Sequence, residues 1–149
     1  VTNIPITVGK GLTGITWGEN LTKDQKQFTK KLFENTSKIY EFTEDYLDIF
    51  LALTSSGPAI IALIIEALSD GGLSGGLPKI LSEELIMEMM LGTISLIKEN
   101  QLTPSELKNL VTSPGGTTIS ALRVLEKKSI RSALIESIVS ASNRSKEFN

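Results

Sequence analysis

Two reactive residue types are missing from the chain, since its 149 residues include no cysteine and no histidine. Without cysteine there is no disulfide bond, no thiolate nucleophile and no thiolate metal site, which agrees with a reducing, cytoplasmic setting. Without histidine, Ser-His-Asp hydrolysis and histidine-based zinc sites are excluded. We therefore expect no bound metal.

The chain also has little excess of one charge sign over the other, and it has few aromatic side chains. The chain has 15 basic and 17 acidic residues, for a net charge of −2, and Phe, Trp and Tyr make up 5% of it. This balance creates no field that would gather nucleic acid, and it offers few stacking platforms, so we expect no nucleic-acid partner. A hydrophobic content of 40% is nevertheless enough for the core of one globular chain.

A long uninterrupted hydrophobic run is absent as well. Residues 59–68 are apolar except for Glu66, and polar residues at 54–57 separate them from the preceding apolar stretch. A membrane span needs roughly twenty apolar residues, so we expect none here. The chain opens at Val1 with no basic leader, from which we expect neither a signal peptide nor a native N-terminus.

The first 45 residues differ in pattern from the rest. We expect strand, strand, helix and strand, at residues 4–8, 12–17, 22–36 and 38–43. The helix should begin with a capping box made by Thr22 and Gln25. Because these elements cannot close a core of their own, we interpret residues 1–45 as the end of a larger α/β domain whose sheet has further strands.

From residue 46 to residue 149 the pattern is helical throughout. We expect a long helix up to about Lys98 whose apolar side chains point inward, namely Ile80, Leu81, Leu85, Ile86, Met89 and Met90. The preceding helix, over residues 59–68, is apolar on nearly all sides and must be buried on all sides. This much apolar surface exceeds what one subunit easily hides, so residues 46–149 are predicted to form an all-helical domain with a partner, and a monomeric helix bundle is the alternative.

Residues 103–126 are the stretch most typical of a binding site. Thr103, Pro104 and Glu106 form a helix start, and Pro114 with two glycines ends that helix and leads into another. A helix N-terminus with free N–H groups attracts anions. The N–H groups here and the hydroxyls of Ser113, Thr117 and Thr118 would surround a small carboxylate or phosphate. Composition alone favours an ordinary helix connection, and the stretch lacks the nucleotide P-loop pattern.

The same stretch resembles the signature of the pyrroline-5-carboxylate reductase family. The matching residues are Pro104, Leu107, Val111, Ser113, Pro114, Gly115, Gly116, Thr118, Ala121, Leu122, Leu125 and Glu126. The resemblance extends to Thr2-Asn3, Ser56-Gly57-Pro58-Ala59, Asp70-Gly71-Gly72 and Arg144-Ser145-Lys146-Glu147. Family members begin with a dinucleotide-binding domain, and no GxGxxG follows a strand here, so the chain looks like the back part of a longer protein.

The resemblance implies an oxidoreductase that reduces 1-pyrroline-5-carboxylate to proline with NADPH or NADH. It implies that residues 1–45 complete a Rossmann-type dinucleotide-binding domain, and that Asn3 and Pro5 lie near the nicotinamide. It also implies that the substrate carboxylate is held by Val111, Ser113, Thr117 and Thr118, with Gly115 and Gly116 allowing close approach. The protein would be a twofold homodimer or an oligomer of dimers. Leu51 stands where many family members have a threonine suspected of contacting the substrate nitrogen, so the proton donor is unknown; Thr54 or an already protonated imine would fill the role. The competing interpretations are a related imine or keto-acid reductase and a helical dimerisation module without catalysis.

Overall fold

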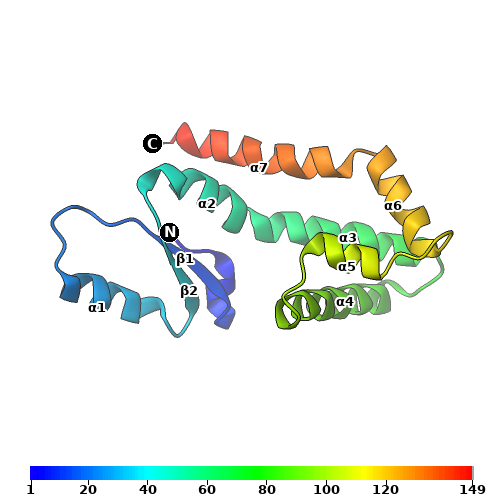
Figure 1. Cartoon of the computed structure of the whole chain (residues 1–149), viewed down its shortest axis with the longest axis horizontal. Coiled ribbons are helices and arrows are strands. Elements are labelled where there is room, and N and C mark those ends of the chain that lie inside the picture. Colours follow the sequence, from blue (N-terminus) through cyan, green and yellow to red (C-terminus); the bar gives the residue numbers. More distant parts are fainter. Residues whose placement is uncertain (149) are drawn as a thin grey trace. The chain divides into compact units, whose positions relative to one another are not determined.

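Figure 1 shows the computed structural model of the chain, which describes residues 1–148. The elements in order are η1 (Ile4–Val8), β1 (Gly11–Ile15), α1 (Lys23–Phe33), β2 (Ser37–Glu41), η2 (Glu44–Tyr46), α2 (Leu47–Thr54), α3 (Gly57–Ser74), α4 (Lys79–Glu99), α5 (Pro104–Leu110), α6 (Thr117–Lys127) and α7 (Ile130–Lys146). A short α/β segment thus precedes a chain of helices, which confirms the predicted fold class.

The α/β segment contains one pair of parallel strands, β1 and β2, in the register that sets Gly11 opposite Ser37. These two strands and the capping box of α1 were predicted correctly. The expected strand at residues 4–8 was wrong, because these residues form the 3-10 helix η1. Pro5 in the first turn fixes a helical φ, and Gly9, at φ 69°, closes the last turn in the left-handed region.

Helices α2 and α3 are separated by a short break at Ser55 and Ser56. Helix α3 ends at Ser74, inside the glycine-rich stretch of residues 71–76, and the chain turns at Gly76 with φ 96°. Gly72 lies against Ser82 of α4.

The described chain divides into two compact units. One consists of Val1–Ile60 with the residues from 134 onward, and the other is Ile61–Ala133, so the division falls inside α3 and α7. The predicted domain boundary between residues 45 and 46 stays a prediction.

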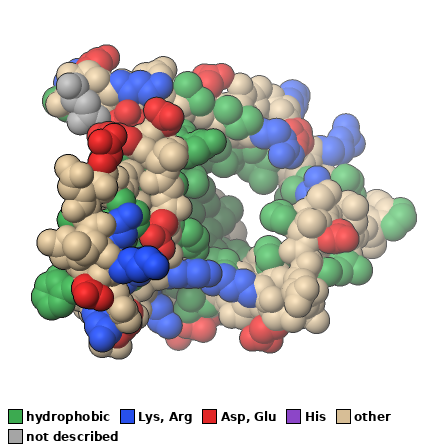
Figure 2. Space-filling view, turned by 60° about the vertical axis from the view of Figure 1, so that its left-hand side comes forward, with side chains coloured by type: hydrophobic (Ala, Val, Ile, Leu, Met, Phe, Trp, Pro, Cys, Tyr) green, Lys and Arg blue, Asp and Glu red, His purple; other side chains and the backbone are tan. Residues whose placement is uncertain are grey.

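Hydrophobic side chains are poorly covered within the single chain. Only Ile15, Ala52 and Leu107 are buried hydrophobic residues among those described. The accessible surface is 11159 Å² for 16.1 kDa, where a compact monomer of that mass exposes about 7,400 Å². Figure 2 shows hydrophobic side chains reaching the surface in several places.

The expected inward face of α4 is largely exposed in the single chain. Ile80 is 82% exposed, and Leu85 and Met89 are about half exposed. The prediction that these side chains are buried was therefore wrong for the single chain. The helical stretch Glu44–Ser74 is also long and apolar enough, by length and composition alone, to cross a membrane, although α2 and α3 are interrupted within it. Both observations indicate apolar surface that something outside the single chain covers.

Candidate functional site: an anion loop and the α2–α3 junction

The candidate carboxylate loop begins with a well-anchored helix, α5. The Glu106 carboxylate accepts hydrogen bonds from Thr103 N and Thr103 Oγ1, both at 2.7 Å, and Thr103 Oγ1 accepts one from Glu106 N. These bonds hold the pKa of Glu106 below its usual value, the backbone bond most strongly. The predicted capping box is therefore present, and it fixes where α5 enters the loop.

The loop itself depends on two glycines for two different reasons. Gly115 has φ 71°, a left-handed conformation that a side chain disfavours. Gly116, by contrast, has φ −75° and ψ 173° as the N-cap of α6. Its requirement is steric, because an added Cβ would collide with Ser113 Oγ and lie 3.3 Å from Ser113 O.

The loop gathers the predicted carboxylate-binding residues at the start of α6. Gly116 N donates to Ser113 O at 3.1 Å, which closes the turn and places Thr117 and Thr118 in the first turn of the helix. Within residues 1–148, the hydroxyls of Ser113, Thr117 and Thr118 have no hydrogen-bond partner. Val111 is 56% exposed beside them. Free N–H groups and hydroxyls at a helix N-terminus can bind a carboxylate without a cation.

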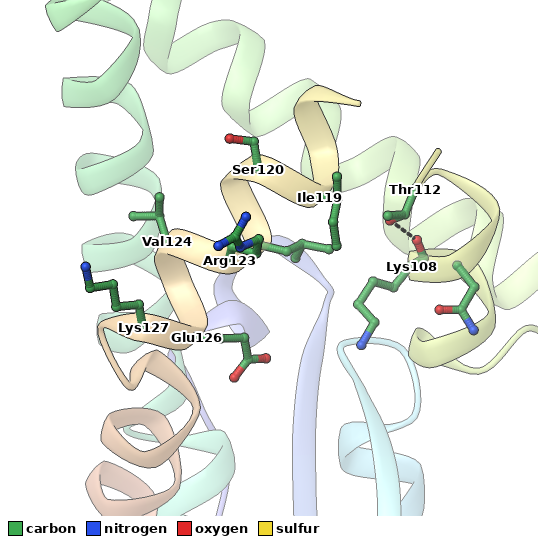
Figure 3. Close-up of a pocket in the computed structure, with 10 residues that line it drawn as sticks. Lys108, Thr112, Ile119, Ser120, Arg123, Val124, Glu126 and Lys127 are labelled. Atoms are coloured by element: carbon green, nitrogen blue, oxygen red, sulfur yellow. Dashed lines mark hydrogen bonds between the residues drawn. The ribbon is translucent and has the colours of Figure 1, made fainter. Parts of the chain in front are cut away.

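A cavity of about 650 Å³ lies between α5 and α6. Lys108, Glu126 and Lys127 are among the residues that line it, and Figure 3 shows Lys108 and Glu126 extending into the space between these helices. Thr112 also lines the cavity, and its hydroxyl donates to Lys108 O at 2.6 Å. None of the hydroxyls predicted to bind the carboxylate lines it, so this cavity and the anion loop are separate features.

Glu126, which lines this cavity, forms an ion pair with Arg131. Arg131 donates to it at 2.7 Å and lowers its pKa, while Lys108 contributes a weaker electrostatic effect. Because these charges are exposed and satisfied by each other, they do not form a perturbed acid–base pair of the kind that catalysis uses.

Asn3 and Pro5, the residues predicted to lie near the cofactor, occupy the start of η1. Pro5 is half-buried, and the neighbouring Ile4 is 71% exposed. Asn3 is buried at 7% exposure, and its side-chain amide is hydrogen-bonded to backbone atoms of Leu12 and Thr54. Its side chain therefore faces the protein.

The junction of α2 and α3 adjoins a second cavity, of about 430 Å³, in the same compact unit. Leu51 and Ser56 line it, together with Asp48, which accepts a hydrogen bond from Ser145 Oγ at 2.5 Å. Thr54, one of the two suggested replacements for the missing threonine, is 8% exposed, and its hydroxyl donates to Phe50 O at 2.7 Å. Burial and that helix bond make Thr54 a poor proton donor.

Comparison with known proteins decides the family. The family model described as pyrroline-5-carboxylate reductase dimerisation matches residues 44–148. The chain belongs to the pyrroline-5-carboxylate reductase family. The reductase of Synechocystis is 43% identical over 98% of this chain and 55% of its own length.

Solved structures of the family agree in fold. The pyrroline carboxylate reductase of Plasmodium falciparum, solved with NADP bound, superposes with a TM-score of 0.95 at 31% identity, over 98% of this chain and 59% of that one. The reductase of Coxiella burnetii gives 0.90 at 36% identity, over 99% and 55%. The chain therefore spans a little over half the length of these relatives.

Sequence reasoning missed two features of these sites. The Asp48–Ser145 bond joins residues 97 positions apart, and no local pattern could have revealed it. The Lys108–Thr112 side of the larger cavity does have a local signal, since the spacing of four residues puts both on one face of a helix.

Proposed function

We propose that this chain is the substrate-binding and dimerisation part of a pyrroline-5-carboxylate reductase, which reduces 1-pyrroline-5-carboxylate to proline in the cytoplasm. The observation that carries the proposal is the loop from Val111 to Thr118. Its left-handed Gly115 and its N-cap Gly116 leave N–H groups and hydroxyls unpaired at the start of α6. Family membership makes a substrate carboxylate the natural occupant.

In this proposal the loop orients the substrate. The oxygens of the carboxylate accept hydrogen bonds from the hydroxyls of Ser113, Thr117 and Thr118 and from N–H groups of the first turn of α6. Gly116 leaves room for close approach, and Val111 supplies an apolar wall. A carboxylate held at two oxygens fixes the ring beside it, which presents the C=N carbon in one orientation.

The nicotinamide cofactor, NADPH or NADH, supplies the hydride when it is bound. Residues 1–46 carry one parallel strand pair and no glycine-rich turn from a strand into a helix, so they do not fit the phosphates of a dinucleotide. They do fit its nicotinamide end, because half-buried Pro5 and exposed Ile4 offer an apolar surface for a flat ring. The backbone of Asn3 and the ring of Pro5 are the groups we place beside it.

The nitrogen of the substrate receives a proton before or during hydride transfer. Leu51 has no proton to give, and the Thr54 hydroxyl is held by Phe50 O. We therefore propose that the imine binds already protonated, so that hydride addition at carbon gives neutral proline nitrogen without a donor from α2.

The homodimer explains the apolar surface. A groove of about 580 Å³ between α3 and α4 is lined by apolar side chains and Thr93. The matched family model is a dimerisation domain, so we assign this groove and the exposed face of α4 to a second copy of the chain, and not to lipid. Larger assemblies would be built of such dimers.

Restoring the missing part tests the proposal. The 149 residues alone should not oxidise NADPH with pyrroline-5-carboxylate, whereas the same chain preceded by a dinucleotide-binding domain should do so. Activity on another cyclic imine or keto acid, but not on this substrate, would favour a related reductase. No turnover with any of them would favour a dimerisation module without catalysis.

A further inference from the structure

The side chain of Asn3 joins three elements of its compact unit. Its Nδ2 donates to Thr54 O at 3.0 Å, across 51 positions of sequence, and its Oδ1 accepts from Leu12 N at 2.8 Å. It makes no capping bond to η1, although its backbone carbonyl accepts from Ile6 N. Both polar atoms of a buried amide are thus directed at backbone atoms of β1 and α2.

The bond to Thr54 meets a structural need of α2. Thr54 is the last residue of this helix, so its carbonyl is among those that have no partner inside the helix. A buried carbonyl needs a hydrogen bond, and Asn3 supplies it. On either side of Thr54 in sequence, Leu51 and Ser56 line the 430 Å³ cavity at the α2–α3 junction.

We infer that Asn3 is a positioning residue, which clamps the start of η1 to the end of α2 through Leu12 and Thr54 and thereby fixes the backbone that the proposed function places beside the nicotinamide. The inference rests on the proposed function, because that proposal places the nicotinamide beside Asn3 and Pro5. The side chain of Asn3 does not touch the cofactor. It acts through backbone placement, to which hydride transfer is sensitive, since a displacement of about 1 Å can cost about a hundredfold in rate.

The substitution Asn3→Asp breaks one end of the clamp and leaves the other. The introduced carboxylate still accepts from Leu12 N–H but cannot donate to Thr54 O. Burial beside a carbonyl oxygen raises the pKa of such a carboxyl, and its protonated form regains a donor for Thr54 O. Acidification should therefore repair the clamp in this variant.

The test uses the protein that carries its dinucleotide-binding domain. At about pH 8, Asn3→Asp should lower kcat roughly ten- to a hundredfold while the Kd for NADPH changes less than about twofold. The ratio of its kcat to that of the unsubstituted protein should recover as the pH is lowered towards about 5.5. The primary isotope effect with deuterated NADPH should rise at pH 8, because a misaligned hydride transfer becomes rate-limiting.

Thr2→Val is the matched control. It removes the bond from Thr2 Oγ1 to Leu12 O and the bond that Thr2 Oγ1 accepts from Thr13 Oγ1, but none to α2, so kcat should stay within about twofold. A raised NADPH Kd with unchanged kcat would overturn the inference, since Asn3 would then be a cofactor ligand. An equal loss of kcat at every pH would also overturn it.

Failure of the proposed function would be recognised separately, because the unsubstituted protein would not reduce pyrroline-5-carboxylate. The clamp would then be tested by urea unfolding of the same variants. Asn3→Asp should be less stable than the unsubstituted protein at pH 8, and the difference should shrink towards pH 5.5. The same difference at both pH values would contradict the clamp.

Discussion

Replacing Gly72 by alanine should push α3 and α4 apart where Gly72 faces Ser82. A Cβ on Gly72 would overlap Ser82 Oγ and lie 3.1 Å from Ser82 Cβ. Ser82 is 2% exposed, and its hydroxyl donates to Ser69 O at 2.9 Å. The hydroxyl cannot stay where it is, and no solvent is available to receive it.

The size of the effect follows from three contributions. Displacing the Ser82 hydroxyl leaves buried polar groups unpaired, which costs about 1 to 3 kcal/mol. Forcing a methyl group between packed helices costs about 1 to 3 kcal/mol more, and alanine returns about 1 kcal/mol through its better helix propensity. The free energy of unfolding should therefore fall by about 3 kcal/mol, which for a chain of this length lowers Tm by about 6 to 12 °C.

Thermal and urea unfolding followed by circular dichroism would measure this change. Gly71→Ala is the matched control, because nothing lies within 4 Å of its Cβ position, and it should leave stability unchanged or raise it slightly. Ser82→Ala combined with Gly72→Ala should recover part of the loss, since the overlapping oxygen is gone. Equal stability of the Gly71→Ala and Gly72→Ala variants would refute the proposed close contact.

Two further predictions concern charge and assembly. Trp17, the single tryptophan, donates to Glu41 at 2.6 Å, and the pKa of Glu41 is lowered, first by its bond to Lys30 and then by that to Trp17. The stabilisation that ionised Glu41 gives is thus present above the usual glutamate pKa, and it is lost as the pH falls through the lower pKa of Glu41 in the folded protein. Tryptophan emission should therefore titrate below about pH 4.5, and Glu41→Gln should abolish that titration. Sedimentation should show dimers at micromolar concentration, whereas a folded monomer at every concentration would contradict the assigned interface.

Local capping chemistry made the starts of α1 and α5 predictable. The capping boxes at Thr22 and Thr103 each need only residues three positions apart, and both formed as expected. The segment at residues 4–8 failed because its β-branched residues favour a strand by propensity, whereas Pro5 and Gly9 fix a helical turn. The backbone angles that these two residues impose outweighed the strand propensity of the β-branched side chains.

The site was predictable only where its residues are neighbours in sequence. Val111 to Thr118 lie on one loop, and the left-handed Gly115 follows from the Pro-Gly-Gly pattern. The role of Gly116 depends on where Ser113 points, and the clamp from Asn3 to Thr54 depends on how distant elements pack. Neither contact leaves a periodic signal in the sequence.

Substrate affinity after Thr118→Val tests the central claim most directly. Valine keeps the shape of the side chain and removes only the hydroxyl. A hydrogen bond to a charged group is worth about 1.5 to 3 kcal/mol. In the protein with a dinucleotide-binding domain, KM for pyrroline-5-carboxylate should therefore rise about ten- to a hundredfold. The Kd for NADPH should not change. Thr112→Val, whose hydroxyl is bound to Lys108 O, should leave KM unaltered. An unchanged KM and kcat in Thr118→Val would contradict the account and leave the loop a plain helix connection.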